Sequence, residues 1–200
     1  MFLRFFFLSI IAVLWQPQAK TILFFGDSLT AGYGLSPEIA FPALVEKEFI
    51  KENKKVKVIN AGLSGETSAG GLSRIDWILR QPIDVFVLEL GANDGLRGLP
   101  IEQTRKNLQS IIEKVKSKYP RAKIVLAGML VPPNMGKSYA DEFKKIYPAM
   151  ASKNRALLMP FLLEGVAGNE KLNQADGIHP NAEGHRIVAN NLVTFLRPLI

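Results

Sequence analysis

The chain has 200 residues, of which 48% are hydrophobic, and this length and composition fit one globular domain with a full-sized core. Lysine and arginine exceed aspartate and glutamate by seven, 25 against 18, but no dense basic block occurs, so the charge predicts a solvated surface and no nucleic-acid partner. Because the sequence has no cysteine, disulfides, thiolate metal sites and a cysteine nucleophile are excluded.

The first 19 residues, MFLRFFFLSIIAVLWQPQA, have the layout of a secretory signal peptide. One basic residue, Arg4, precedes an apolar stretch at residues 5–15, and Pro17 follows it. This stretch is shorter than the ~20 residues that a spanning helix needs. We therefore expect removal of residues 1–19 and a mature domain of residues 20–200 in the periplasm or outside the cell. The residues before Ala19 do not form a small-x-small motif, so an uncleaved N-terminal membrane anchor is the alternative.

Five apolar runs follow the leader, and stretches with helical spacing separate them. Four apolar residues in a row, as at residues 22–25, are typical of a strand buried on both faces of a parallel sheet. The expected strands are at residues 21–25, 56–60, 83–90, 123–130 and 156–161. Helices are expected from the spacing of Ile101, Leu108, Ile111, Ile112 and Val115, and of Val188, Leu192, Phe195 and Leu196. This alternation predicts one α/β domain, a three-layer α/β/α sandwich with a central, mostly parallel five-stranded sheet, roughly flavodoxin-like.

Loops rich in Gly, Ser, Asn and Asp follow these strands. Their sequences are GDSLTAG at residues 26–32, AGLSGETSAGG at 61–71, GANDGLRG at 91–98 and ADGIHPNAEGH at 175–185. The carboxyl ends of parallel strands meet at one edge of the sheet, which is where ligands bind in open α/β folds. We therefore expect the four loops to meet there and to form the functional site.

Ser28 is the candidate nucleophile of this site. A serine hydroxyl is weak at neutral pH, so it needs an adjacent base and a third group that orients the base. Of the two histidines, His179 lies three residues after Asp176, and a tight turn there brings the carboxylate to one ring nitrogen and leaves the other for Ser28. His185 falls in the helix expected after Pro180 and is expected to be a surface or core residue.

Acyl transfer also needs donors that face the developing oxyanion. The backbone N–H of Ser28 is one candidate, and Gly65 offers a second N–H that no side chain covers. Asn93 offers a side-chain amide that donates without carrying charge. Asp27 is expected to hold its own loop through backbone N–H groups. These residues predict an oxyanion hole formed by Ser28, Gly65 and Asn93.

The segments FGDSLTAGYG, SGETSAGG, LGANDG and DGIHPN resemble, in order, the four motif blocks of the SGNH (GDSL) hydrolase superfamily. The resemblance extends over nearly the whole mature chain and is closest to bacterial exported arylesterases, acyl-CoA thioesterases and lysophospholipases. It implies the same roles for the same residues: Ser28 as nucleophile, Asp176 and His179 as orienter and base, and Gly65 and Asn93 as oxyanion donors. It also implies acyl ester and thioester substrates and no cofactor.

The sequence gives no sign of a metal or nucleotide site. The two histidines lack metalloprotease spacing, and the glycine-rich segment at residues 62–71 lacks the Gly-Lys-Ser/Thr ending of a phosphate loop. We therefore expect no bound metal.

We expect a serine esterase that acts through an acyl-enzyme on small-molecule or lipid acyl esters, with membrane proximity and oligomeric state left open. A polysaccharide or peptidoglycan O-acetyl deacetylase is the first alternative, and a non-catalytic binding protein is the second. Met135, Tyr139 and Phe143 are candidates for binding an acyl group, because the segment at residues 131–150 is expected to cover the pocket beside Ser28 and these side chains suit an apolar chain. The same side chains also fit a helix core.

Overall fold

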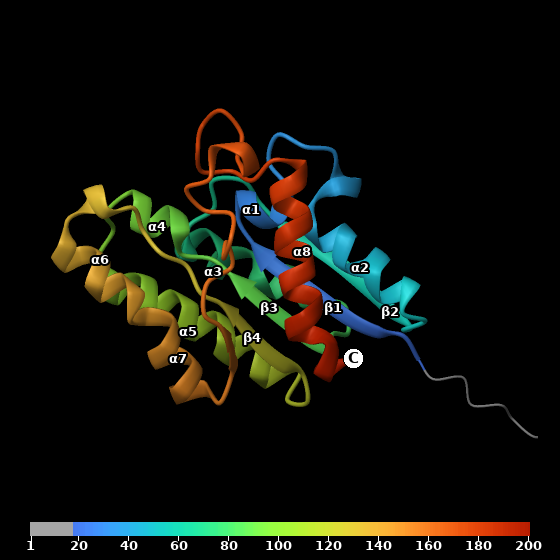
Figure 1. The fold of residues 1–200 in the computed structure, drawn as a ribbon. Helices are drawn as coiled ribbons and strands as arrows, with labels where there is room; N and C mark the ends of the chain where they lie inside the picture. Colours follow the sequence, from blue (N-terminus) through green and yellow to red (C-terminus); the bar gives the residue numbers. More distant parts are fainter. Residues whose placement is uncertain (1–17) are drawn as a thin grey trace, which may run out of the picture.

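The computed structural model describes residues 18–200, so most of the expected signal peptide lies outside the described residues. Five strands form one sheet in the order β2-β1-β3-β4-β5, and every neighbouring pair is parallel (Figure 1). This arrangement confirms the expected fold class. The strands are β1 (Lys20–Gly26), β2 (Val56–Gly62), β3 (Val85–Glu89), β4 (Lys123–Ala127) and β5 (Leu157–Met159).

The last three strands are shorter than their apolar runs suggested. Leu90 and Met129 follow the ends of β3 and β4 and are still buried, at 0% and 4% exposure. An apolar run reports burial, and burial here continues into the loops beyond the last ladder hydrogen bond.

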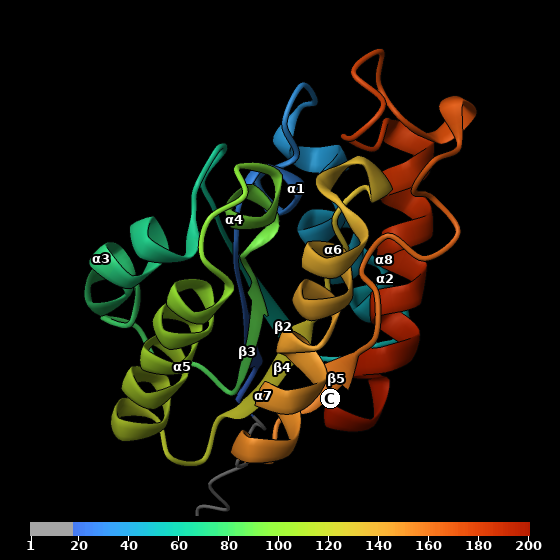
Figure 2. The same ribbon diagram turned by 90° about the vertical axis from the view of Figure 1, so that its left-hand side faces the viewer.

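Helices cover both faces of the sheet (Figures 1 and 2). α2 and α8 pack together on one face, and α3 and α5 pack together on the other, with α7 beside α5. The α-helices are α1 (Ser28–Ala31), α2 (Phe41–Lys51), α3 (Ser68–Ile78), α4 (Ala92–Leu96), α5 (Ile101–Lys118), α6 (Lys137–Lys144), α7 (Ile146–Asn154) and α8 (Ala182–Leu196). Short 3₁₀ turns occur at η1 (Pro37–Ile39), η2 (Pro133–Met135), η3 (Glu170–Leu172) and η4 (Arg197–Leu199).

The sequence patterns account for the packing of these elements. Residues 22–25 of β1 are fully buried, as expected for a central strand covered by helices on both faces. α5 buries Leu108, Ile111, Ile112 and Val115, and α8 buries Val188, Leu192 and Leu196. Within residues 18–200, no helix combines the length and the apolar character needed to cross a bilayer.

Candidate active site

Ser28 lies at the carboxyl edge of the sheet, directly after the central strand β1. β1 ends at Gly26, and the Asp27 carboxylate caps α1 by accepting the backbone N–H of Leu29 at 3.0 Å. Ser28 is therefore the first residue of a short helix, and the turn exposes its side chain at the sheet edge.

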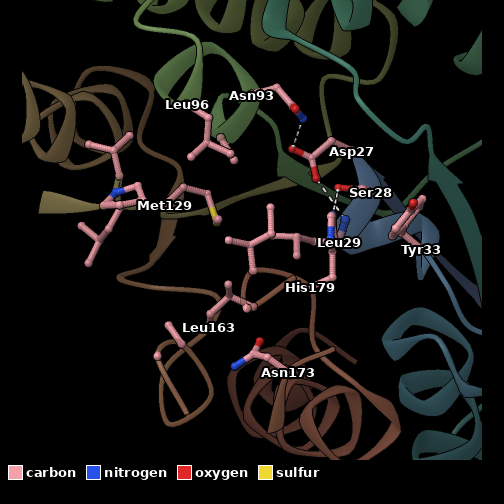
Figure 3. A pocket seen from close by; sticks show the side chains of 18 of the residues that line it. Asp27, Ser28, Leu29, Tyr33, Asn93, Leu96, Met129, Leu163, Asn173 and His179 are labelled. Atoms are coloured by element: carbon pink, nitrogen blue, oxygen red, sulfur yellow. Dashed lines mark hydrogen bonds between the residues drawn. The ribbon is translucent and has the colours of Figure 1, made fainter. Parts of the chain in front are cut away.

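The structure brings Ser28, His179 and Asp176 into one chain of contacts. Ser28 Oγ lies 2.9 Å from His179 Nε2 (Figure 3), and His179 Nδ1 lies 2.7 Å from Asp176 Oδ2. With its proton on Nδ1, the imidazole donates to Asp176 and accepts the hydroxyl proton of Ser28. Residues 151 positions apart in the chain thus share a hydrogen bond.

The loop that carries His179 is built on the Asp176 side chain. Asp176 Oδ1 accepts the backbone N–H groups of Ile178 and His179, both at 3.0 Å, and Gly177 supplies the left-handed turn with φ of +75°. The hydrogen bond from His179 is the main cause that lowers the pKa of Asp176 to about 2. Asp176 is therefore ionised at neutral pH.

Tyr33 links the first loop to the last. Its ring lies 4.7 Å from that of His179, centroid to centroid, and its carbonyl oxygen accepts a hydrogen bond from Gln174 at 2.7 Å. Sequence reasoning missed this contact, and the only available signal was an aromatic residue between two glycines of the first motif. The contact places the Tyr33 ring against the imidazole that faces Ser28.

The second histidine is a core residue. His185 is 1% exposed, and its Nδ1 accepts the backbone N–H of Phe41 at 3.1 Å while the ring stacks on the Phe41 ring. Burial lowers the pKa of His185 to about 4, so it is neutral at physiological pH. The sequence left surface and core open for His185, and the structure places it in the core, on α8.

Gly65 and Asn93 line the same cavity as Ser28. Gly65 has φ of +78°, a conformation that favours glycine whatever the space around it. The Asn93 amide nitrogen donates to Asp27 Oδ2 (Figure 3) and to the carbonyl oxygen of Glu66, each at 3.0 Å. The resting amide is thus held in place from two sides.

The buried Asp94 carboxylate ties the second loop to the third. It accepts the backbone N–H of Ser68 at 2.7 Å, the Ser68 hydroxyl at 2.5 Å and the Thr104 hydroxyl at 3.2 Å. Asn107 donates in turn to Ser68 Oγ. Asp94 adjoins Asn93, so this network fixes the start of α4, from which the Asn93 amide projects.

A cavity of about 660 Å³ opens beside Ser28 and His179. Its wall away from these residues is apolar, and Figure 3 shows Leu96, Met129 and Leu163 on the side of the cavity away from Ser28. These apolar lining residues include Leu96, Met129, Val131, Phe161, Leu163 and Ile178. The cavity therefore offers an apolar surface that can contact an acyl chain next to the nucleophile.

The structure does not bring Met135, Tyr139 or Phe143 to this cavity. Phe143 is fully buried, and its ring lies 6.3 Å from that of Tyr139 and 6.0 Å from that of Tyr147. Tyr139 donates its hydroxyl to the carbonyl oxygen of Leu99 at 2.7 Å. For Phe143 the structure supports the other interpretation of this segment, a helix core, because α6 packs its apolar face inward.

No group of three or more His, Cys, Asp or Glu side chains arranged to hold a metal ion occurs within residues 18–200. The carboxyl edge instead holds a serine, a histidine and a carboxylate in hydrogen-bond contact on an α/β/α sandwich. This combination of fold and site is that of a serine hydrolase.

Comparison with known proteins gives the family. The model of the GDSL-like Lipase/Acylhydrolase family matches residues 24–187. This chain is 39% identical over 194 residues to Esterase TesA of Pseudomonas aeruginosa, and the match covers 96% of each chain. It is 39% identical over 183 residues to Thioesterase 1/protease 1/lysophospholipase L1 of Escherichia coli, over 91% of this chain and 86% of that one. The chain belongs to the GDSL-like lipase/acylhydrolase family and is a serine hydrolase.

A solved structure agrees with this assignment. The psychrotrophic esterase EstA from Pseudoalteromonas sp., in a structure described as inhibited by monoethylphosphonate, superposes with a TM-score of 0.85 at 34% identity. The match covers 90% of this chain and 97% of that one. The whole α/β/α sandwich, and not one motif alone, is therefore shared.

Proposed function

We propose that this enzyme hydrolyses carboxylic acyl esters through Ser28, His179 and Asp176 by way of an acyl-enzyme. The observation that carries the proposal is the unbroken contact from Ser28 through His179 to an ionised Asp176, beside an apolar cavity. In this arrangement the imidazole accepts the serine proton and the carboxylate holds the imidazole in the required tautomer.

The reaction has two stages in this proposal. Ser28 Oγ attacks the acyl carbon while His179 Nε2 takes the hydroxyl proton, and the imidazolium then protonates the leaving alkoxide or thiolate. Water, deprotonated by the same imidazole, then attacks the acyl-enzyme and releases the acid and the free Ser28 hydroxyl. Asp176 balances the imidazolium charge in both stages.

Ser28 and Gly65 supply backbone N–H groups for the oxyanion in this proposal, and Asn93 supplies its side-chain amide. Both amide hydrogens of Asn93 are engaged in the resting site, so the oxyanion competes with Asp27 or with the Glu66 carbonyl for one of them. A donor of this kind typically contributes ~2.7–4 kcal/mol to transition-state stabilisation.

The substrate class follows from the cavity. Its apolar wall suits the hydrocarbon part of an aryl or short-to-medium acyl ester, a thioester or a lysophospholipid. The names of the relatives, esterase and thioesterase/lysophospholipase, support the same classes. An acetylated sugar, the substrate of the alternative deacetylase, would meet few polar partners on this wall.

A panel of substrates tests the proposal. We expect p-nitrophenyl esters and acyl-CoA thioesters with chains longer than acetyl to be hydrolysed with higher kcat/KM than acetylated xylan or acetylated peptidoglycan. The acyl chain gains apolar contacts in the transition state, whereas a sugar gains few. A preference for the acetylated glycans would favour the deacetylase and contradict this assignment.

We also propose that the enzyme is exported and acts in the periplasm or outside the cell. The support is the leader sequence at residues 1–19, with its single basic residue and short apolar stretch. The expected mature protein begins at or near Lys20, which mass spectrometry of the exported fraction measures. An intact N-terminus in the membrane fraction would instead favour the anchor.

A further inference from the structure

Glu89, a buried acid close to the turn that carries Ser28, has no part in the proposed acyl transfer. Glu89 is the last residue of β3 and pairs in register with Gly26, the last residue of β1. Its side chain is fully buried, as is the side chain of Thr30 in the helix that Ser28 begins. Buried carboxyl groups are rare and costly unless they are partnered, so the contacts of Glu89 indicate what it does.

Glu89 binds the turn between β1 and α1, which carries Ser28. Its Oε2 accepts the backbone N–H of Asp27 at 3.1 Å and the hydroxyl of Thr30 at 2.7 Å. The absence of a side chain at Gly26 makes this arrangement possible. A Cβ there would lie 2.1 Å from Thr30 Oγ1 and 2.3 Å from Glu89 Oε2. The glycine that precedes Asp27 and Ser28 thus leaves room for the Glu89 carboxyl.

The Asp27 and Glu89 carboxyls interact with each other, and neither forms a salt bridge within the described part of the chain. Arg74 reaches the same strand ends by donating to the carbonyl oxygens of Gly26 and Ala61, but its charge is paired with Glu66. Two adjacent buried carboxyls without a cation of their own hold one proton between them.

Other titratable groups surround this pair. Tyr147 of α7 donates its hydroxyl to the Leu90 carbonyl oxygen, and burial together with the nearby carboxyls raises its pKa, so it remains a neutral phenol. His179 lies on the Asp27 side, and the hydrogen bonds from the Leu29 N–H and the Asn93 amide favour the ionised form of that carboxyl. The surroundings therefore favour the ionised form of Asp27 more than that of Glu89.

The contacts assign the proton to Glu89. Both oxygens of Asp27 accept hydrogen bonds, one from the Leu29 N–H and one from the Asn93 amide, each at 3.0 Å. Glu89 Oε1 accepts none from residues 18–200. Burial raises the pKa of Asp27 to about 6, whereas burial and the neighbouring Asp27 raise that of Glu89 well above its usual range.

We propose that Glu89 is a positioning residue that works as a neutral carboxylic acid. It accepts the Asp27 N–H and the Thr30 hydroxyl, and it donates its own proton toward the Asp27 carboxylate. Asp27, kept ionised, then holds the Asn93 amide and the start of α1. The proposal rests on the function proposed above for Ser28 and Asn93, and it adds the acid that aligns both.

Comparison of the Glu89→Gln and Glu89→Ala variants tests whether Glu89 acts as a neutral acid. Glutamine keeps the shape and a donor, so we expect kcat within about threefold of the wild type, whereas alanine is expected to lower kcat by roughly tenfold or more with little change in KM. Phosphonate titration of reactive Ser28 corrects each rate for the fraction of folded enzyme. A Gln variant as slow as the Ala variant, or an Ala variant of full activity, would overturn the proposal.

The pH dependence of stability gives a readout that does not need substrate. The folded protein keeps a proton that the unfolded chain releases above about pH 4.5, so Glu89 makes stability fall as pH rises toward its raised folded pKa. Glu89→Gln should remove that part of the fall. The matched control is Glu66→Gln, which should lower Tm at neutral pH because it removes the partner of Arg74.

These measurements also distinguish the two proposals. If the wild type hydrolyses no ester, the proposed function fails, while the melting curves still report whether Glu89 is neutral. If Glu89→Ala does not fold, the pH profile of Glu89→Gln decides alone. A Glu89→Gln protein with the wild-type dependence of Tm on pH, or one destabilised as much as Glu66→Gln, would show that Glu89 is ionised and overturn the inference.

Discussion

Replacing Ser28 by alanine is expected to abolish ester hydrolysis and to leave the fold intact. The substitution removes the only atom that attacks the acyl carbon, and loss of a triad member typically costs about 10⁴-fold or more in kcat. The fold should persist because the Ser28 side chain bonds only to His179 among the described residues. Its carbonyl oxygen, which accepts the N–H groups of Gly32 and Tyr33, is unchanged in the variant.

Hydrolysis of a p-nitrophenyl ester, labelling by a fluorophosphonate and the melting temperature measure these effects. The matched control is Ser73→Ala, which removes an exposed hydroxyl that donates within α3 to the Gly70 carbonyl oxygen. That variant should keep both activity and labelling. An active Ser28→Ala enzyme, or a phosphonate adduct on another residue, would refute the assignment of the nucleophile.

Replacing His179 by alanine should cost several orders of magnitude in kcat, comparable with the loss of Ser28, because the triad acts as a unit. Asp176→Asn should also be severe, since an asparagine amide no longer holds the proton on Nδ1. The His179 hydrogen bond lowers the pKa of Asp176 to about 2, so Asp176 is an ionised partner of the imidazole at neutral pH, and asparagine removes that charge.

His185 provides the control for this experiment. It is a neutral, buried acceptor for the Phe41 N–H, and its pKa of about 4 removes it from titration near neutral pH. His185→Gln keeps an acceptor and should retain near-normal kcat/KM, with a loss of stability of about 1–3 kcal/mol if the Phe41 N–H is left unpaired. A dead His185→Gln enzyme beside an active His179→Ala enzyme would show that the base lies on α8.

The fold could be predicted because its signals are local and repeated. Fully apolar runs mark strands buried on both faces, and the spacing of apolar residues in α5 and α8 marks the faces that pack on the sheet. Alternating strands and helices then allow few topologies, because the connections must be short and right-handed. The ends of β3, β4 and β5 were predicted less well, since Leu90 and Met129 are buried without being in strands.

Ser28, His179 and Asp176 could be placed together from the sequence because parallel strands bring their loops to one edge, and because the Asp-x-x-His turn is local. The distance between Asp176 and His179 depends on three residues of chain and one glycine in a left-handed turn. The sequence also separated the two histidines, since one follows an acid in a loop and the other falls in the last helix; the structure then places His185 in the core.

Other features were decided only by the tertiary structure. The spacing of Tyr139 and Phe143 is the same for a helix that lines a pocket as for one that packs inward, and only the position of α6 against its neighbours places Phe143 in the core. The contact of Glu89 with Asp27 joins residues 62 positions apart, and that of Asp94 with Ser68 joins residues 26 apart. Sequence patterns report which residues are buried and in what element; the partner of a buried polar group depends on how separate strands and helices pack, which no local pattern encodes.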